Sequence, residues 1–501
     1  MSQLFLLRAG KIKSELLTAS CNVGTRPDVY HPSPHSFRMS LAIFCDLPVE
    51  VWELIFFWCL PTPSNAAQHI VFMRRQTLNS PQYAPLLLCH VCRQWRSIVL
   101  SSPRLWTTLS VLIRLGAAVP APDLVALWLS RSGVLPLDLA LHQQNESYAN
   151  CIAAGRILDV FKRRIPQWGR VHFELFGPLA TRLGVNGDKT LPLLRNFRLS
   201  IADNLSGEDE EGLFGVFNHV PLLRKLHVSR IPQLHLSGRS TVQVPWRQLA
   251  YLSLDYVPAV QTALRILDMC PNLETCLMKI DITQGSLLYD PLRLPKLHTL
   301  SINLGFESLA WFLDQITLPQ LINLTVSVRG PLEQYRWAQE QFDAFLTRSD
   351  CRIRRLEIHD TGMTGQEFVS CVRHPGLQAL AELVINDTKG WTLDPFVTQA
   401  ALDLLATPTF HHSSHTRGRE YQYPDTCFLP TLERLTIHGN CFVSPDGVIA
   451  NMVESRWRCH GSQVTRLNHL DLELPMNHVE DMRRLKKLQG EGLQVVLSQQ
   501  Y

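Results

Sequence analysis

Two cysteines with the spacing of a metal or redox site, Cys89 and Cys92, are the first residues whose types could carry chemistry. A zinc site built on this pair needs two more cysteine or histidine ligands. The sequence has no second Cys-x-x-Cys and no histidine pair near the first one. Cys92 also falls on an apolar stripe at helical spacing. We therefore predict packed thiols here rather than a metal site.

Two other polar segments could hold a cation, but neither has the pattern that a cation site requires. His411, His412 and His415 lie in a polar stretch without a cysteine partner. The acidic stretch 207–212 lacks the ligand spacing of a calcium-binding loop. Phosphate-binding glycine loops, Gly-x-Ser-x-Gly and His-Glu-x-x-His are also missing from the sequence. We therefore expect no catalytic residues, no metal, no cofactor and no enzyme activity.

The apolar residues that follow Leu47 have helical spacing. Pro48 suits a helix start because its missing N–H costs nothing there, and Glu50 favours the positive N-terminal end. Pro61 and Pro63 end the segment. One apolar face is predicted from positions i, i+3, i+4 and i+7, which are Val51, Leu54, Ile55 and Trp58.

A second short helix is predicted after a polar insert at 62–84. Ser102 and Pro103 close this helix. Both helices are too short to be stable alone, so they must pack on each other or on a partner. The apolar stripe of the second helix consists of Leu88, Val91, Cys92, Trp95 and either Ile98 or Val99.

This segment resembles an F-box, and most closely the F-box proteins abundant in mushroom-forming (basidiomycete) fungi. The resemblance is close over residues 47–106, although the insert at 62–84 is longer than a minimal F-box needs. It implies docking on a Skp1-like adaptor and, through that adaptor, on a cullin–RING ubiquitin ligase. The positions assigned to adaptor binding, or to the fold that supports it, are Leu47, Pro48, Glu50, Ile55, Phe56, Val91, Cys92, Trp95, Pro103, Leu105 and Trp106.

A repeated Pro-x-Leu-x-x-Leu-x-(Leu/Ile/Val) pattern follows, with clear copies at Pro295 and Pro319. The first leucines of successive copies stand at 194, 223, 249, 273, 297 and 321, so they are 29, 26, 24, 24 and 24 residues apart. These values are typical of leucine-rich repeats, which place one strand and one helix or turn in each unit. Later copies are less regular, and a polar stretch near 405–428 predicts an inserted loop.

We therefore predict an α/β fold in which a short N-terminal helical F-box precedes a leucine-rich-repeat solenoid. In such a solenoid the leucines point inward from a curved parallel sheet, and helices lie outside. Alternate strand residues face the concave side. That face is polar and mixed in charge, which fits either a solvated sheet face or a partner-binding surface. The candidate target-binding residues are His227, Tyr251, Asp255, Asn303, Arg355, His359, Arg434 and His438.

The expected domain order follows from these patterns. Residues 1–40 form a flexible tail, and Met39 is an alternative start to Met1. Residues 41–110 form the F-box with its insert. Residues 111–190 alternate irregularly between helices, expected at 123–130 and 152–165, and strands, expected at 135–141 and 171–175. Residues 191–501 form the solenoid.

The composition excludes several classes of protein. Of the 501 residues 46% are hydrophobic and 18% are charged, and the net charge of +4 disfavours nucleic-acid binding. No apolar run approaches the roughly 18 residues of a membrane span. The apolar part of the N-terminus is too short for a secretory signal. Thirteen unevenly spaced cysteines fit reduced thiols, so a cytoplasmic or nuclear location is expected.

Together these expectations favour the substrate-recognition subunit of an SCF-type (Skp1–cullin–F-box) E3 ubiquitin ligase. Its repeats would bind a target protein that the sequence does not identify. The alternative is a leucine-rich-repeat interaction scaffold whose F-box acts outside a ubiquitin ligase. A hydrolase or transferase is disfavoured because no set of nucleophile, base and charge-stabilising group stands out.

Overall fold

The chain divides into two compact units, Met1–Leu223 with Thr241–Val244 (unit 1) and Arg224–Ser240 with Pro245–Tyr501 (unit 2). The computed structural model describes residues 47–60, 85–176, 179, 181–183, 190–201, 217, 219–229, 244–282, 291–329, 337–387, 396–407, 427–439, 441–459 and 464–499. Several sequence-based predictions lie outside these residues. They concern the tail 1–40 with Met39, the insert at 62–84, the acidic stretch 207–212, the histidines at 411–415 and most of the loop near 405–428.

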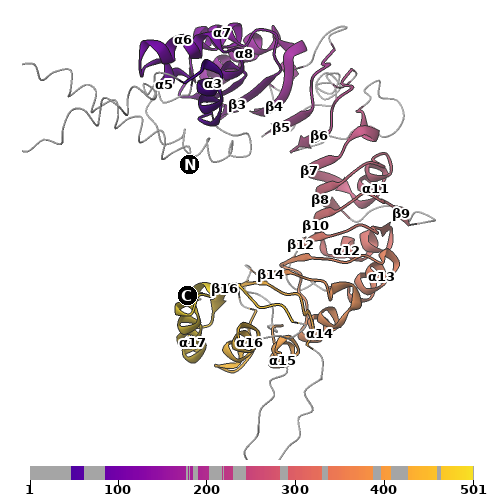
Figure 1. Ribbon diagram of the computed structural model, residues 1–501. Coiled ribbons are helices and arrows are strands. Elements are labelled where there is room, and N and C mark those ends of the chain that lie inside the picture. Colours follow the sequence, from indigo (N-terminus) through magenta and orange to yellow (C-terminus); the bar gives the residue numbers. More distant parts are fainter. Residues whose placement is uncertain are drawn as a thin grey trace, which may run out of the picture. The chain divides into compact units, whose positions relative to one another are not determined.

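The described part of unit 1 begins with four short helices, which we call the helical module (Figure 1). Pro48 occupies the N-cap position of the first helix, one residue before the position predicted for it, and Glu50 lies in the first turn. Helix α3 packs on α6 and η2, and α5 packs on α6. The module consists of α3 (Val49–Trp58), α5 (Leu86–Cys89), α6 (Arg93–Ser101) and the 3-10 helix η2 (Pro103–Trp106).

A mostly parallel sheet follows in unit 1, with strand order β5-β4-β3-β1-β2. Among the described strands of this sheet, β1 and β2 form the one antiparallel pair. Strand β1 was not predicted, because no turn signal separates it from η2. Predicted helices and strands at 123–130, 135–141, 152–165 and 171–175 correspond to α7, β3, α8 and β4. The bounds are β1 (Thr108–Arg114), β2 (Ala117–Val119), α7 (Pro122–Arg131), β3 (Leu137–Gln143), α8 (Tyr148–Lys162), η3 (Ile165–Gln167), β4 (Trp168–Leu175), η4 (Thr181–Leu183) and β5 (Asn196–Ile201).

Unit 2 is a parallel sheet with strands in sequence order from β6 to β17 and with helices along its outer side (Figure 1). The strands are β6 (Lys225–Val228), β7 (Tyr251–Ala259), β8 (Thr275–Ile282), β10 (Thr299–Gly305), β12 (Asn323–Arg329), β13 (Arg355–His359), β14 (Glu382–Asp387), β15 (Arg434–Gly439), β16 (His469–Leu474) and β17 (Gln494–Gln499). The helices are α11 (Val260–Asp268), α12 (Phe306–Asp314), α13 (Gln339–Ser349), α14 (Gly365–Arg373), α15 (Gln399–Leu405), α16 (Val448–Trp457) and α17 (Val479–Gly490). Smaller elements are η6 (Trp246–Gln248), η8 (Pro375–Leu377) and the paired short strands β9 (Leu292–Arg293) and β11 (Ile316–Thr317).

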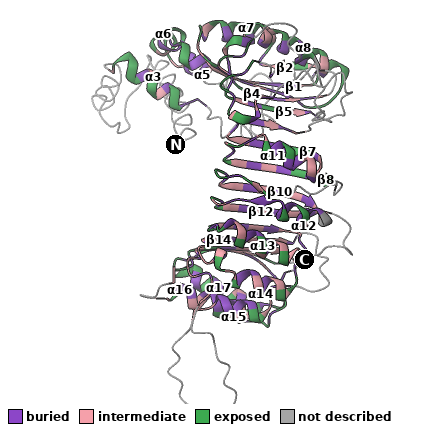
Figure 2. Cartoon of the chain, turned by 90° about the vertical axis from the view of Figure 1, so that its right-hand side faces the viewer, coloured by how far each residue is buried: buried purple, intermediate pink, exposed green. Residues whose placement is uncertain are grey.

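The strand register of unit 2 aligns the leucines of the repeat. Cross-strand pairing joins Leu300 to Leu324, Leu324 to Leu356 and onward to Leu470. These leucines are buried, and the residues that alternate with buried ones along β10, β12 and β13 are half-buried (Figure 2). One unit could not bury its leucines alone, so adjacent units stabilise one another. This arrangement confirms the predicted leucine-rich-repeat class of fold.

The buried side chain of Arg456 contacts residues at both ends of the predicted 405–428 loop. The Arg456 guanidinium of α16 donates to the backbone carbonyls of Leu405, Phe428 and Leu429. Burial lowers the pKa of Arg456, because the charged form loses its hydration. These carbonyls replace water as hydrogen-bond partners, which fixes the described residues on either side of the loop.

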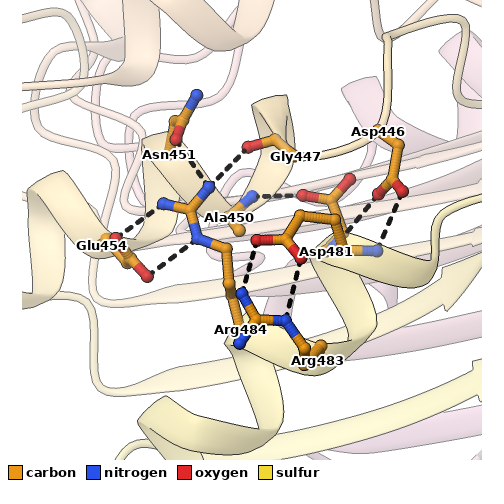
Figure 3. Close-up of polar contacts among 9 residues, drawn as sticks. Asp446, Gly447, Ala450, Asn451, Glu454, Asp481, Arg483 and Arg484 are labelled. Atoms are coloured by element: carbon orange, nitrogen blue, oxygen red, sulfur yellow. Dashed lines mark hydrogen bonds and ion pairs between the residues drawn. The ribbon is translucent and has the colours of Figure 1, made fainter.

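Helices α16 and α17 are held together by polar contacts (Figure 3). Arg484 donates to both carboxylate oxygens of Glu454, at 3.1 and 2.7 Å, and to the side chain of Asn451 at 2.8 Å. Asp446 accepts from the backbone N–H groups of Glu480 and Asp481, both at 2.9 Å, which satisfies donors at the start of α17. The outermost helices of the unit are therefore fixed by directional bonds as well as by apolar contacts.

Replacing Arg484 with alanine should destabilise unit 2 by about 1–2 kcal/mol, because a two-pronged charge-assisted contact is lost. Chemical denaturation of the full chain measures this change in the free energy of unfolding. Arg483→Ala is the matched control, because Arg483 is exposed and bonds only to Glu480 within the same helix. Equal destabilisation by both variants would show that Arg484 does not join the helices as described.

Every cysteine among the described residues is unpaired, as expected for reduced thiols. Burial raises the pKa of Cys351 to about 11, so that thiol stays protonated and unreactive at neutral pH.

Among the described residues, no helix combines the length and the apolar character that crossing a membrane requires.

Candidate docking surfaces

An aromatic cluster forms the inner side of the helical module. Trp52 and Phe56 of α3 are buried, and their ring centroids lie 5.1 and 4.9 Å from that of Trp95 on α6. These tilted and edge-on arrangements are the favourable ones for aromatic pairs. The prediction that the two apolar segments pack on each other is confirmed, and the large rings of Trp52 and Phe56 provide the contact on α3.

Three of the four residues of the predicted apolar face of α3 point away from the module, so this face does not form its internal packing. Val51, Leu54 and Trp58 are exposed, and Trp58 retains 71% of its accessible surface and Leu54 59%. Helix α3 is apolar almost all around, so its spacing alone did not indicate which side faces inward. We call the exposed residues Val51, Leu54 and Trp58 the outer stripe.

The second predicted helix is two helices, and Cys92 lies at their junction. Its backbone is extended and its sulfur accepts from the Trp95 N–H at 3.4 Å, so it caps α6. The prediction of a packed thiol is therefore wrong for the exposed Cys92 and right for the buried Cys89. Burial raises the pKa of Cys89, which leaves the thiol protonated. The extended backbone of Cys92 and its capping contact with Trp95 interrupt the helix at this point.

The end of the module is anchored in the interior of unit 1. Trp106 is fully buried, and its Nε1 donates to the Val99 carbonyl at 2.8 Å. The ring packs edge-on against Trp128 at 5.1 Å, and Arg131 lies 4.5 Å from its centroid. Trp106 therefore holds the module to the α7 layer of unit 1 and cannot itself contact a partner.

The residues assigned to adaptor binding fall into three groups by exposure. Those on the surface can contact a partner directly, and those in the interior can act only by supporting the fold. The exposed members are Pro48, Glu50, Cys92 and Pro103, the half-buried ones are Leu47, Ile55, Val91 and Trp95, and the buried ones are Phe56, Leu105 and Trp106. The outer-stripe residues were predicted as an apolar face but were not assigned to the adaptor.

The polar face of unit 2 carries a network of opposite charges on adjacent strands. Arg355 contacts Glu357 on its own strand and Glu382 on β14, in each case at 2.5 Å. Arg434 lies 3.7 Å from the same Glu382, and His359 lies 3.3 Å from Glu357. Burial alone would raise the pKa of Glu357, but contacts with Arg355 and His359 hold it below its usual range. Glu382 was not among the predicted candidates, although it lies at the start of β14, opposite Arg355 and Arg434.

The remaining candidates on this face also have polar neighbours. His438 lies 2.8 Å from Asp471, His227 lies 3.5 Å from Asp255, and the Asn303 amide donates to Ser327 at 3.0 Å. Tyr251 lies under the ammonium group of Lys225, which is 5.9 Å from the ring centroid. The face is thus a preordered surface of mixed sign, which suits a polar protein partner better than a polyanion.

The fold defines a class, a leucine-rich-repeat protein with a short helical module N-terminal to its repeats. No protein-family model and no curated protein matches the sequence. Among solved structures, the chain is similar to the crystal structure of the Rad7 and Elc1 complex in yeast. The identity is 12% and the TM-score 0.38, and the alignment covers 87% of this chain and 98% of that one. Similarity at this level does not by itself assign a function.

Proposed function

We propose that this chain is the substrate-recognition subunit of an SCF-type E3 ubiquitin ligase. The helical module docks on a Skp1-like adaptor, and the polar face of unit 2 binds a target protein. The observation that carries the proposal is the outer stripe on α3. A short helix leaves large apolar side chains in water beside an inner face that is already filled with aromatic rings.

The energetics of the outer stripe favour a protein partner. Exposed apolar residues occur singly on most surfaces, but neighbouring ones on a short helix typically mark an interaction site. Trp58 is the most exposed of the three, and tryptophan is enriched among the residues that dominate binding energy. The F-box resemblance of residues 47–106 supports a Skp1-like adaptor as this partner.

The mechanism is proximity rather than catalysis by this chain. Binding the adaptor and the target at once raises the effective concentration of a target lysine near a charged ubiquitin-conjugating enzyme. The chain needs only two separate surfaces for this role. The outer stripe supplies an apolar surface, and the Arg355 network supplies a charged one.

Replacing both Leu47 and Pro48 with alanine should abolish co-purification of the adaptor while leaving the repeats folded. Pro48 fixes the backbone at the N-cap of α3, and Leu47 precedes it. Their loss should let the first turn of α3 fray. The measurement is co-purification of adaptor with the tagged full chain, with circular dichroism as the folding check.

The matched control for that variant is Val134→Ala with Val479→Ala, two exposed apolar residues outside the module. Undiminished adaptor recovery in the Leu47/Pro48 variant would remove these residues from the docking surface. Recovery of the adaptor without a cullin in the unmodified chain would favour the scaffold alternative over the ligase.

A further inference from the structure

Three side chains on adjacent strands of unit 1 converge on the polar face of the sheet. His142 belongs to β3, and His172 and Glu174 belong to β4. The register pairs His142 with Glu174 directly, and His172 lies two residues earlier on the same face. One potential ligand atom from each side chain lies within 4.8 Å of the other two.

The two histidine–glutamate contacts lie at ion-pair distance, but neither pair has the alignment of a hydrogen bond. Nδ1 of His142 lies 3.0 Å from one oxygen of Glu174, and Nε2 of His172 lies 3.3 Å from the other. Neither nitrogen has a hydrogen-bond partner, although His142 is only 3% exposed. A buried ring nitrogen without a partner is costly, so the arrangement is incomplete as it stands.

We propose that His142, His172 and Glu174 bind one divalent first-row transition-metal ion, for which Zn²⁺ is the probe. Two imidazoles and one carboxylate are ligands that such ions accept. Ligand atoms about 2.0–2.2 Å from a tetrahedral ion lie roughly 3.4 Å from one another. The 3.0 and 3.3 Å separations, which end on different oxygens of Glu174, are of this order, and a shared ion would give each nitrogen a coordination partner.

The charges of the three groups suit a cation. A neutral imidazole offers a lone pair to a metal ion, and a carboxylate contributes negative charge. Glu174 is partly exposed, which leaves further coordination positions for water or for a group of a bound partner.

A second cluster of histidine and carboxylate side chains differs from this triad, because its ligand atoms already have hydrogen-bond partners. Asp446, His478 and Asp481 also lie close together. Asp446 accepts two backbone N–H groups, Asp481 accepts the Ala450 N–H at 2.7 Å, and His478 is 2.8 Å from Asp481 in a hydrogen bond. These ligand atoms are already used to join α16 and α17, so this cluster carries no metal proposal.

The test compares the full-length chain with Glu174→Gln, which keeps the shape of the side chain and removes its charge. After dialysis against chelator, Zn²⁺ is titrated calorimetrically, and Co²⁺ absorption reports the coordination geometry. The unmodified chain should bind about one molar equivalent more than the variant, or bind it roughly 100-fold more tightly. Zn²⁺ should also raise the melting temperature of the unmodified chain but not that of the variant.

The matched control is Asp471→Asn, which makes the same chemical change beside a single histidine, His438. It should bind Zn²⁺ like the unmodified chain. His172→Asn provides a second variant in case Glu174→Gln alters the fold, which circular dichroism would reveal. Equal Zn²⁺ stoichiometry and affinity in the unmodified chain and in folded variants of this triad would overturn the proposal.

Discussion

Replacing Trp58 with aspartate is expected to abolish adaptor binding while destabilising the chain by at most about 1 kcal/mol, because the new carboxylate lies at the C-terminal end of α3. Trp58 is the most exposed residue of the outer stripe, so it contributes little to the folded monomer. A carboxylate there would have to be desolvated against an apolar partner surface. The expected loss of affinity is at least about 30-fold, equivalent to about 2 kcal/mol. Calorimetry with purified full-length chain and purified Skp1-type adaptor measures it.

The control for Trp58→Asp is Tyr148→Asp on helix α8. Tyr148 is an exposed aromatic residue outside the helical module, at the first position of its helix. An aspartate is well tolerated at that end of a helix, so this variant should fold and bind the adaptor normally. If Trp58→Asp binds the adaptor as tightly as the unmodified chain, the outer stripe is not the docking surface.

Replacing Trp106 with alanine should have the largest effect on stability, about 3–5 kcal/mol. The change empties a fully buried site, removes the bond to the Val99 carbonyl and ends the contacts with Trp128 and Arg131. The module would then be held less firmly to the rest of unit 1. Adaptor binding should weaken in parallel with the loss of folded module.

Chemical denaturation of the full chain, followed by circular dichroism, measures the Trp106→Ala effect. The matched control is Trp311→Ala, because Trp311 lies half-exposed on α12 and should cost much less. A change of under about 1 kcal/mol for Trp106→Ala would contradict its role as the anchor of the module.

The fold was predictable where one short pattern recurs. Because every repeat places its leucines at the same offsets, positions such as Leu300, Leu324 and Leu356 could be assigned to the interior before the register was known. The alternating residues of β13 and β15 followed from the two-residue period of a strand. The terminal strand β17 carries no clear copy of the pattern and was not predicted.

The packing of the helical module was harder to predict, because the spacing of apolar residues does not show which side of a helix faces the interior. Helix α3 has apolar residues on several sides, and only the aromatic contacts with Trp95 determine that Trp52 and Phe56 face inward. The break at Cys92 depends on how α6 packs, which spacing along the chain does not encode. The class of fold could therefore be assigned from sequence, whereas the side of α3 that faces outward could not.

The proposed metal site could not be predicted from the sequence for a related reason. His142 lies on a different strand from His172 and Glu174, and the three converge only because β3 and β4 pair in a particular register. Along the chain they form no motif of the kind sought around Cys89 and Cys92. Long-range pairing creates such sites, and a single sequence does not specify it.

The most direct test of the ligase assignment is native affinity purification of the tagged full-length chain beside its Trp58→Asp variant. We predict that the unmodified chain recovers a Skp1-like adaptor together with a cullin, and that the variant loses both. Proteins that bind unit 2 should be recovered with either chain. Absence of adaptor and cullin from the unmodified chain, or their equal recovery with the variant, would contradict the account.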